Sequence, residues 1–374
     1  MSLKRSVLEG FIGLLSKLYP KSKGQRPNKI FVLRNNDIGD LLVSTPIFEA
    51  LKKAHPEAYI IAGVGSWNTP ILEGNPFVDE ILPINAPWHN KQTCRTLHNS
   101  FFGLLHSLCY IYTSAEVKTL KTAHCDTGID ILGSPEGSLL MMRAHIPDRI
   151  GVKGYAGGHS ACTKTLPFDP SRHVSASAIA LAELLTEPHQ KPITTEPRPQ
   201  LYLSEAEIHQ AETIWKKYAE GKHARRILIG IGGGLKDKCW PASHFAELVQ
   251  QIATQGAYTF LSIGTQDECR SASLLDTVTK HHTNLCGHTS LRESFALCAK
   301  ADLVLCNPSM LMHVAAAFHR PTAVMLGASF HSAKEHDKLW GYPDTCITFG
   351  PEPTSPAITS PEAVLNTLTQ KHWL

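Results

Sequence analysis

Short apolar strands alternate with helical patterns along most of this sequence. The first such unit covers residues 29–56: the run Ile30–Leu33 leads into a polar turn that contains Asp40, and apolar residues then recur at helical spacing until Pro56. A strand that hands over to a helix, followed by another strand, is typical of a parallel, doubly wound sheet. The alternation therefore predicts an α/β fold.

The alternation occurs in two series. The second begins at Arg226, and residues 186–200 between the two are rich in Pro, Thr and Glu, as linkers often are. We expect two Rossmann-like domains whose sheets face a central cleft with their carboxyl edges, where such folds bind ligands. The predicted division is a basic amphipathic helix in 1–28, an N-terminal domain in 29–200, a C-terminal domain in 201–350, and a tail with a helix in 351–374.

Composition excludes several functional classes. The chain has 374 residues and a net charge of only +3, which argues against a dedicated nucleic-acid binder. Its ten cysteines form no C-x-x-C pair and its 20 histidines form no H-E-x-x-H motif, so neither a metal site nor a bound cofactor is indicated. Most cysteines lie in apolar runs, which suits buried thiols in a reducing cytoplasm.

The N-terminal 28 residues form a basic amphipathic pattern. Apolar residues from Leu3 to Tyr19 recur at helical spacing, and six basic residues face a single acidic one, Glu9. Such a helix either lies peripherally in the headgroup region of an anionic membrane or docks on the protein's own surface. No run reaches the roughly 18 apolar residues of a membrane span, and no cleavage site follows this segment, so we expect a cytoplasmic protein.

Asp40 lies where the first strand hands over to a helix. In one register it caps a helix that starts there, but Pro46 would then fall inside that helix and delete a hydrogen bond. In the other register Thr45 is the cap, Pro46 takes the first helical position, and Asp40 belongs to the loop. In the second register the carboxylate is freer to take part in chemistry at the sheet edge.

The second series contains a candidate phosphate site. Gly232, Gly233 and Gly234 end a strand, and glycines let backbone N–H groups approach an oxyanion closely. Lys236 and Lys238 follow, and a flexible ammonium beside such a loop can neutralise a pyrophosphate. We assign this role to Lys238 and treat Lys236 as a surface charge.

Four short motifs carry a family resemblance. They are Gly39-Asp40-x-Leu42 with Pro46, Asp237-Lys238-x-Trp240-Pro241, Leu285-Cys-Gly-x-Thr-Ser-Leu291, and Met312-His313-x-Ala-Ala-Ala317. In this order the motifs resemble glycosyltransferase family nine, the heptosyltransferases of lipopolysaccharide core synthesis. The resemblance spans residues 29 to 350 and leaves out the N-terminal basic helix and the middle of the first domain.

The resemblance implies a GT-B fold and an inverting, metal-independent transfer of a sugar from a nucleotide diphosphate sugar, typically ADP-heptose. The first domain would bind a glycolipid or oligosaccharide acceptor at the inner face of the inner membrane, and the second would bind the donor. Asp40 would be the general base and Lys238 would hold the departing pyrophosphate, which matches the proton acceptor and anion stabilisation that in-line displacement needs.

Further donor contacts are expected along the second domain. Glu268 is placed to hydrogen-bond a ribose or, equally, to cap a helix, and His313 is either a polar contact or a packed helix residue. The full donor-binding set is Gly232, Gly233, Gly234, Trp240, Gly264, Glu268, Asn307, Ser309 and His313.

One loop departs from the family pattern. Family members usually read Asn-Asp-Ser/Thr-Gly where this chain has Asn307-Pro308-Ser309-Met310, so a carboxylate and a glycine are missing. This departure leaves the donor sugar open. It also leaves open a second reading, a non-catalytic nucleotide-sugar or glycan-binding relative. A Rossmann oxidoreductase is disfavoured because the dinucleotide fingerprint is absent.

Overall fold

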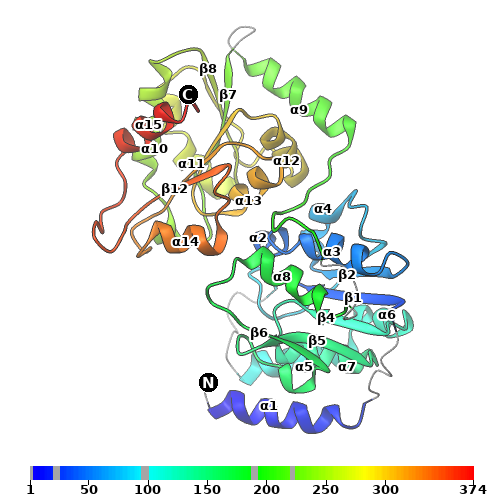
Figure 1. The fold of residues 1–374 in the computed structure, drawn as a ribbon. Helices are drawn as coiled ribbons and strands as arrows, with labels where there is room; N and C mark the ends of the chain where they lie inside the picture. Colours follow the sequence, from blue (N-terminus) through cyan, green and yellow to red (C-terminus); the bar gives the residue numbers. More distant parts are fainter. Residues whose placement is uncertain (1–2, 20–25, 94–100, 187–192, 220–223) are drawn as a thin grey trace. The chain divides into compact units, whose positions relative to one another are not determined.

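The computed structural model describes residues 3–19, 26–93, 101–186, 193–219 and 224–374. The chain divides into two compact units, Met1–Gln200 and Leu201–Leu374. Each unit contains one parallel six-stranded sheet (Figure 1). The expected α/β class with two doubly wound sheets is confirmed.

The sheet of the first unit has the strand order β3-β2-β1-β4-β5-β6. This is the Rossmann order, in which the chain reverses its direction of winding between β1 and β4. The strands are β1 Lys29–Arg34, β2 Tyr59–Val64, β3 Glu80–Pro83, β4 Thr127–Asp130, β5 Asp148–Lys153 and β6 Lys164–Pro167.

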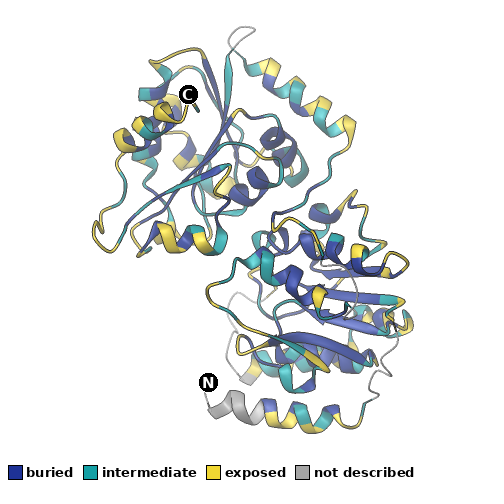
Figure 2. Cartoon of the chain, in the orientation of Figure 1, coloured by how far each residue is buried: buried dark blue, intermediate teal, exposed yellow. Residues whose placement is uncertain are grey.

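Helices cover this sheet, and the interior between them is apolar. One core cluster joins Ile12 of the N-terminal helix to Phe31 and Leu33 of β1 and to Leu139–Met142, and the strands are buried along most of their length (Figure 2). The helices are α1 Leu3–Ser16, α2 Ile38–Leu42, α3 Pro46–Ala54, α4 Thr69–Leu72, α5 Phe101–Thr113, α6 Ala115–Thr122, α7 Pro135–Arg143 and α8 Val174–Glu183, with short 3-10 turns η1 Ser66–Asn68 and η2 His159–Ala161.

The second unit repeats this topology. Its sheet has the order β12-β11-β10-β7-β8-β9, so the winding reverses between β7 and β10. The strands are β7 Arg225–Gly230, β8 Tyr258–Ser262, β9 His282–Asn284, β10 Leu303–Cys306, β11 Thr322–Met325 and β12 Cys346–Phe349.

The helices of the second unit begin where local sequence signals place them. Ser204 and Ser290 each close a capping box with a glutamate three residues later, and α9 and α12 start directly after them. The helices are α9 Glu205–Tyr218, α10 Ala242–Ala253, α11 Cys269–Ala272, α12 Leu291–Ala299, α13 Met310–Ala317, α14 Ala333–Trp340 and α15 Pro361–Gln370, with 3-10 turns η3 Lys236–Lys238, η4 Gln266–Glu268 and η5 Leu275–Thr277.

Both terminal segments are part of the units. Helix α1 packs on η2 and α7 in the first unit, and α15 packs on α10 in the second. Val364 and Leu368 of α15 are fully buried in the second core, so residues 351–374 are no free tail. Within the described part of the chain, no helix has the length and hydrophobicity to cross a membrane.

Candidate functional site

Asp40 lies within a short helix, α2, that was predicted in neither of the two registers. Asp37, not Asp40, is the N-cap of the short helix α2, and Asp40 occupies the first turn of that helix. A separate helix, α3, has Thr45 as its N-cap and Pro46 in its first turn, as the second register required. The correction has a physical reason: a proline has no backbone N–H to continue α2, so the chain forms two helices in place of one.

The carboxylate of Asp40 is held by a buried arginine. Arg34 ends β1, and its Nη2 lies 3.4 Å from Asp40 Oδ1 while its Nε donates to the Asp40 carbonyl oxygen at 3.3 Å. The Arg34 side chain is only 7% exposed, whereas that of Asp40 is 36% exposed. The carboxylate is therefore oriented from the protein side and still reachable from solvent.

Amide side chains pin the loop between Arg34 and Asp40 to its neighbours. Asn35 Nδ2 donates to the Trp88 carbonyl oxygen at 3.0 Å, and Asn36 Nδ2 donates to that of His89 at 2.8 Å. The Asn36 carbonyl oxygen in turn accepts from Asn68 Nδ2 at 2.8 Å. The loops that follow β1, β2 and β3 thus form one connected edge beside the point where the winding reverses.

In the second unit the glycine loop lies at the corresponding position. Residues Gly232–Gly234 follow β7, and Asn307 follows β10, so both flank the reversal point of this sheet. The fully buried Asn307 joins the two loops: its Nδ2 donates to the Ile231 carbonyl oxygen at 2.6 Å, and its Oδ1 accepts from the Trp240 backbone N–H at 2.8 Å. Asn307 therefore supports the loop from beneath.

Glu268 lies over two of the predicted glycines. A Cβ on Gly232 would lie 1.6 Å from Glu268 Oε1, and one on Gly264 would lie 2.3 Å from Oε2. A side chain at either glycine would require the end of the flexible Glu268 side chain to shift. Glu268 also accepts from the Thr265 backbone N–H at 2.6 Å as part of a capping box, so the capping role is present in this structure.

Lys238 ends the exposed 3-10 turn η3, which is fixed to the end of β11. The Gly327 backbone N–H donates to the Lys238 carbonyl oxygen at 3.0 Å. A Cβ on Gly327 would lie 2.6 to 2.7 Å from three backbone atoms of Asp237, Lys238 and Cys239, so this close approach requires glycine. The Lys238 ammonium lies 5.8 Å from the ring centre of Phe330.

The surroundings of Lys238 include a buried histidine that sequence reasoning missed. Burial, and then the positive charge of Lys238, lower the pKa of His336 from 6.5 to about 4. Its ring packs edge-on against Phe330, with centroids 5.5 Å apart. His336 is therefore neutral near pH 7.

Three of the predicted donor contacts are buried. Trp240 lies in the core of the second unit, and its Nε1 donates to the Thr359 carbonyl oxygen at 2.8 Å. Asn307 is buried as described above, and His313 is 5% exposed with Nδ1 at 2.8 Å from the Tyr342 hydroxyl oxygen. Ser309 differs from these three, because it is half-buried at the start of α13 and its side chain makes no capping bond.

Cys239 follows Lys238 but has no activated thiol. Burial, and then the carboxylates of Glu268 and Asp237, raise the pKa of Cys239. A protonated, half-buried thiol is a poor nucleophile, which agrees with a structural role.

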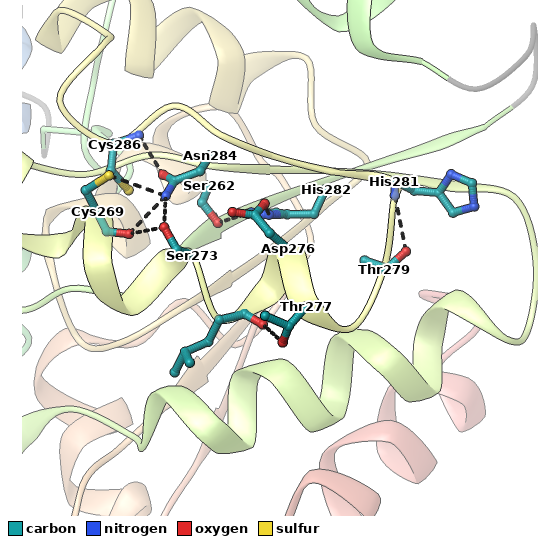
Figure 3. A network of polar contacts seen from close by, with 11 residues as sticks. Ser262, Cys269, Ser273, Asp276, Thr277, Thr279, His281, His282, Asn284 and Cys286 are labelled. Carbon is teal, nitrogen blue, oxygen red and sulfur yellow. Dashed lines mark hydrogen bonds and ion pairs between the residues drawn. The ribbon is translucent and has the colours of Figure 1, made fainter.

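A polar network ties the ends of β8 and β9 together (Figure 3). His282 Nε2 lies 2.7 Å from Ser262 Oγ, and His282 Nδ1 lies 2.7 Å from Asp276 Oδ1. Ser262 is fully buried, so this chain of groups presents no nucleophile to solvent. Asn284 extends the network by donating to the Cys269 carbonyl oxygen at 2.9 Å. The network fixes the strand end from which Gly264 and Glu268 follow.

Comparison with known proteins identifies the family. The family model described as glycosyltransferase family 9 (heptosyltransferase) matches residues 114–359, which is more than half of the chain. This chain belongs to glycosyltransferase family 9. The family 9 chain is 25% identical over 358 residues to lipopolysaccharide heptosyltransferase 2 of Salmonella typhimurium, covering 87% of this chain and 95% of that protein.

Solved structures share the GT-B fold of this family 9 chain. The structure of E. coli ADP-heptose lipopolysaccharide heptosyltransferase II matches with a TM-score of 0.69 at 22% identity, covering 91% of this chain and 98% of the other. The structure of E. coli heptosyltransferase WaaC with ADP matches with a TM-score of 0.68 at 16% identity, covering 91% and 99%. The family match makes the chain a glycosyltransferase of the heptosyltransferase type, and the solved structures show its fold.

Proposed function

We propose that this family 9 chain transfers a heptose-like sugar, with inversion and without a metal, from an ADP-linked donor to a lipopolysaccharide core or related glycolipid acceptor. Two relatives support the substrate class: one is a lipopolysaccharide heptosyltransferase 2, and another, a heptosyltransferase, was solved with ADP. The proposal assigns the acceptor to the first unit and the nucleotide to the second.

The observation that carries the proposal is the carboxylate of Asp40. It is partly exposed at the carboxyl edge of the first sheet and is held by Arg34. A general base must be ionised, oriented and reachable by the hydroxyl it deprotonates. We assign the base role to Asp40 and a positioning role to Arg34, which does not itself touch the substrate.

The proposed step is a single displacement at the anomeric carbon. The acceptor hydroxyl oxygen forms a bond to that carbon and passes its proton to Asp40, while the bond from the carbon to the phosphate oxygen breaks. Its electron pair leaves with the β-phosphate of ADP. Lys238 and the backbone N–H groups of Gly232–Gly234 would stabilise the charge that develops there.

The loop of residues 307–310 has no carboxylate to bind the donor sugar, so other groups must do so. Pro308 and Met310 occupy positions at which family members usually have Asp and Gly, and both residues are half-buried here. Ser309, whose hydroxyl makes no capping bond, and the N-terminus of α13 are the polar groups this loop retains. We therefore propose that Ser309 contacts donor hydroxyls, with a sugar that tolerates the bulk of Met310.

The experiment compares two carboxylates of one loop. We expect Asp40→Asn to lower the rate of heptose transfer by about a hundredfold or more, because general bases contribute that much, while ADP still raises the melting temperature. Asp37→Asn is the matched control and should cost less than about tenfold, since the Asp37 carboxylate makes no capping bond to α2 and contacts Lys91 at 3.7 Å.

Two results would remove Asp40 from the mechanism. One is a transfer rate for Asp40→Asn close to that of the unaltered protein. The other is an equal loss in Asp37→Asn, which would point to damage to the loop and not to proton transfer. The alternative that the sequence left open, a non-catalytic nucleotide-sugar or glycan-binding protein, receives no support from the family comparison. Measured turnover would exclude it.

A further inference from the structure

The N-terminal helix α1 is firmly docked on the first unit. The carboxylate of Glu9 is 5% exposed and accepts hydrogen bonds from the backbone N–H of Gly158, from that of Ser160 at 3.2 Å and from Ser160 Oγ at 2.6 Å. His159 Nδ1 lies 3.5 Å from the same carboxylate. One turn further, Ile12 is fully buried in the core. A buried carboxylate with several donors fixes how the helix is rotated about its axis.

This rotation points an apolar stripe outward. Phe11, Leu14 and Leu18 are 59%, 65% and 81% exposed. They recur with the spacing of one helical face, whereas Ile12 and Ser16 on the other face are buried. Exposed large apolar side chains in a row are unusual on a soluble protein and indicate an interaction surface.

A second helix that packs on α7 also exposes large apolar side chains. Helices α1 and α5 both pack on α7, and Figure 1 shows the three together in the first unit. Phe102, Leu105 and Tyr112 of α5 are 70%, 45% and 49% exposed and share one helical face. Among the described residues, α1 with its following turn and α5 supply six of the eleven exposed large hydrophobic side chains. We call Phe11, Leu14, Leu18, Phe102, Leu105 and Tyr112 the apolar stripe.

Described basic side chains lie beside the apolar stripe. Residues 1–28 contain six basic residues and one acidic residue, and that acidic residue, Glu9, is buried. Lys17 is exposed next to Leu18, and the guanidinium of Arg143 lies 5.5 Å from the ring centre of Tyr112. The only acidic side chain of residues 1–28 is therefore turned inward, and Lys17 remains exposed.

We propose that the apolar stripe and its basic rim bind the surface of an anionic lipid bilayer. Apolar side chains would enter the boundary between headgroups and acyl chains, and nearby cations would be attracted to anionic headgroups. Charge complementarity selects this occupant over a second copy of the chain, because a two-fold contact would bring the same basic rims together. Membrane binding itself does not depend on catalysis. The benefit we infer from it, that it brings the enzyme close to a glycolipid acceptor, rests on the proposed function.

The test measures sedimentation of the full chain with lipid vesicles. We expect binding to vesicles that contain phosphatidylglycerol, weaker binding to vesicles of phosphatidylcholine alone, and weakening by salt. The triple variant Phe11→Ser, Leu14→Ser, Leu18→Ser should lose at least about tenfold in affinity, since each side chain buried is worth over 1 kcal/mol. Leu274→Ser, at an exposed leucine of the second unit, is the matched control and should bind like the unaltered protein.

Two further measurements keep the outcome decisive. Thermal unfolding and transfer to a lipid-free oligosaccharide acceptor should be unchanged in the triple variant, which separates membrane binding from folding and from the proposed function. The proposal is overturned if the unaltered chain ignores anionic vesicles or if the triple variant binds them equally. It is also overturned if the unaltered chain does not bind lipid and light scattering shows that it is a dimer whereas the triple variant is a monomer.

Discussion

Lys236 and Lys238 lie in the same 3-10 turn, η3, but their surroundings differ. Both are exposed in η3, but only Lys238 is fixed at its backbone to Gly327 and lies near Phe330 and the buried His336. A side chain that starts from a fixed backbone loses less entropy when it binds an anion. This difference supports the sequence-based choice of Lys238 over Lys236.

We expect Lys238→Ala to weaken ADP binding by about tenfold or more, because hydrogen bonds to charged groups contribute about 1.5–3 kcal/mol. Lys236→Ala, the neighbouring control, should change ADP affinity by less than about threefold. Isothermal titration with ADP measures both. Equal losses in the two variants would mean that only the net charge of the turn matters.

His336 makes the stability of the second unit depend on pH. Its pKa is lowered from 6.5 to about 4 by burial and then by Lys238. The unfolded chain therefore binds this proton more readily than the folded chain, and stability is lost as the pH falls below 6.5. The loss reaches on the order of 3 kcal/mol by pH 4.

The variant His336→Asn should flatten this part of the stability curve. Urea unfolding at pH 7 and at pH 4.5 measures the effect: the difference between the two pH values should be smaller in the variant than in the unaltered protein. His319→Asn is the control, since His319 is exposed and has a positive φ that asparagine adopts readily. An unchanged pH difference in His336→Asn would show that other groups carry it.

At the scale of elements, the contact between η3 and the end of β11 positions the phosphate-side loop. Backbone hydrogen bonds join the two segments: the Ser329 N–H donates to the Asp237 carbonyl oxygen at 3.2 Å, and the Gly327 N–H to that of Lys238. Backbone atoms cannot rotate away from an added methyl group. A side chain at Gly327 must therefore move one segment relative to the other.

We expect Gly327→Ala to destabilise the second unit by about 1–3 kcal/mol and to lower the rate of transfer as Lys238 is displaced. Gly10→Ala is the control, because a Cβ at Gly10 would have no atom within 4 Å. Thermal unfolding and a transfer assay test both variants. A Gly327→Ala protein that is fully stable and active would show that the contact is adaptable.

Sequence patterns predicted most elements of this fold, and the exceptions have physical causes. The helix Leu291–Ala299, for example, begins at a capping box of Ser290 and Glu293, which is a local sequence signal. The strand β6, Lys164–Pro167, was missed: it lies at the edge of its sheet and none of its residues is buried, so its sequence carries no hydrophobic signal. The sequence pattern indicated helix α5 only weakly, since apolar residues lie on both faces of this helix.

The candidate site was predictable in part. Gly232, Lys238 and Asp40 follow strands in the sequence, and strands of a parallel sheet end at one edge, so their placement followed from the alternation. The roles of Trp240 and Asn307 did not follow, because burial is decided by the whole packed unit: both support the loop from within. Arg34 had one signal, a charged residue at the end of a buried strand.

For the whole molecule, the two sheets repeat one topology, and the family comparison spans both units. Each unit places its candidate residues beside its own reversal point: Asp40 follows β1, and the glycine loop follows β7. The terminal segments join these units through buried residues, Ile12 at one end and Val364 at the other.

The sequence by itself determined the fold class, the two series of strands and the position of Asp40 and the glycine loop along them, because periodicity and turn residues act over a few neighbouring positions. Tertiary structure decided which side chains are exposed. Glu9 turns inward to Gly158 and Ser160, residues about 150 positions away, and so directs Phe11, Leu14 and Leu18 to the surface. Such contacts depend on packing between distant segments, which no local pattern encodes.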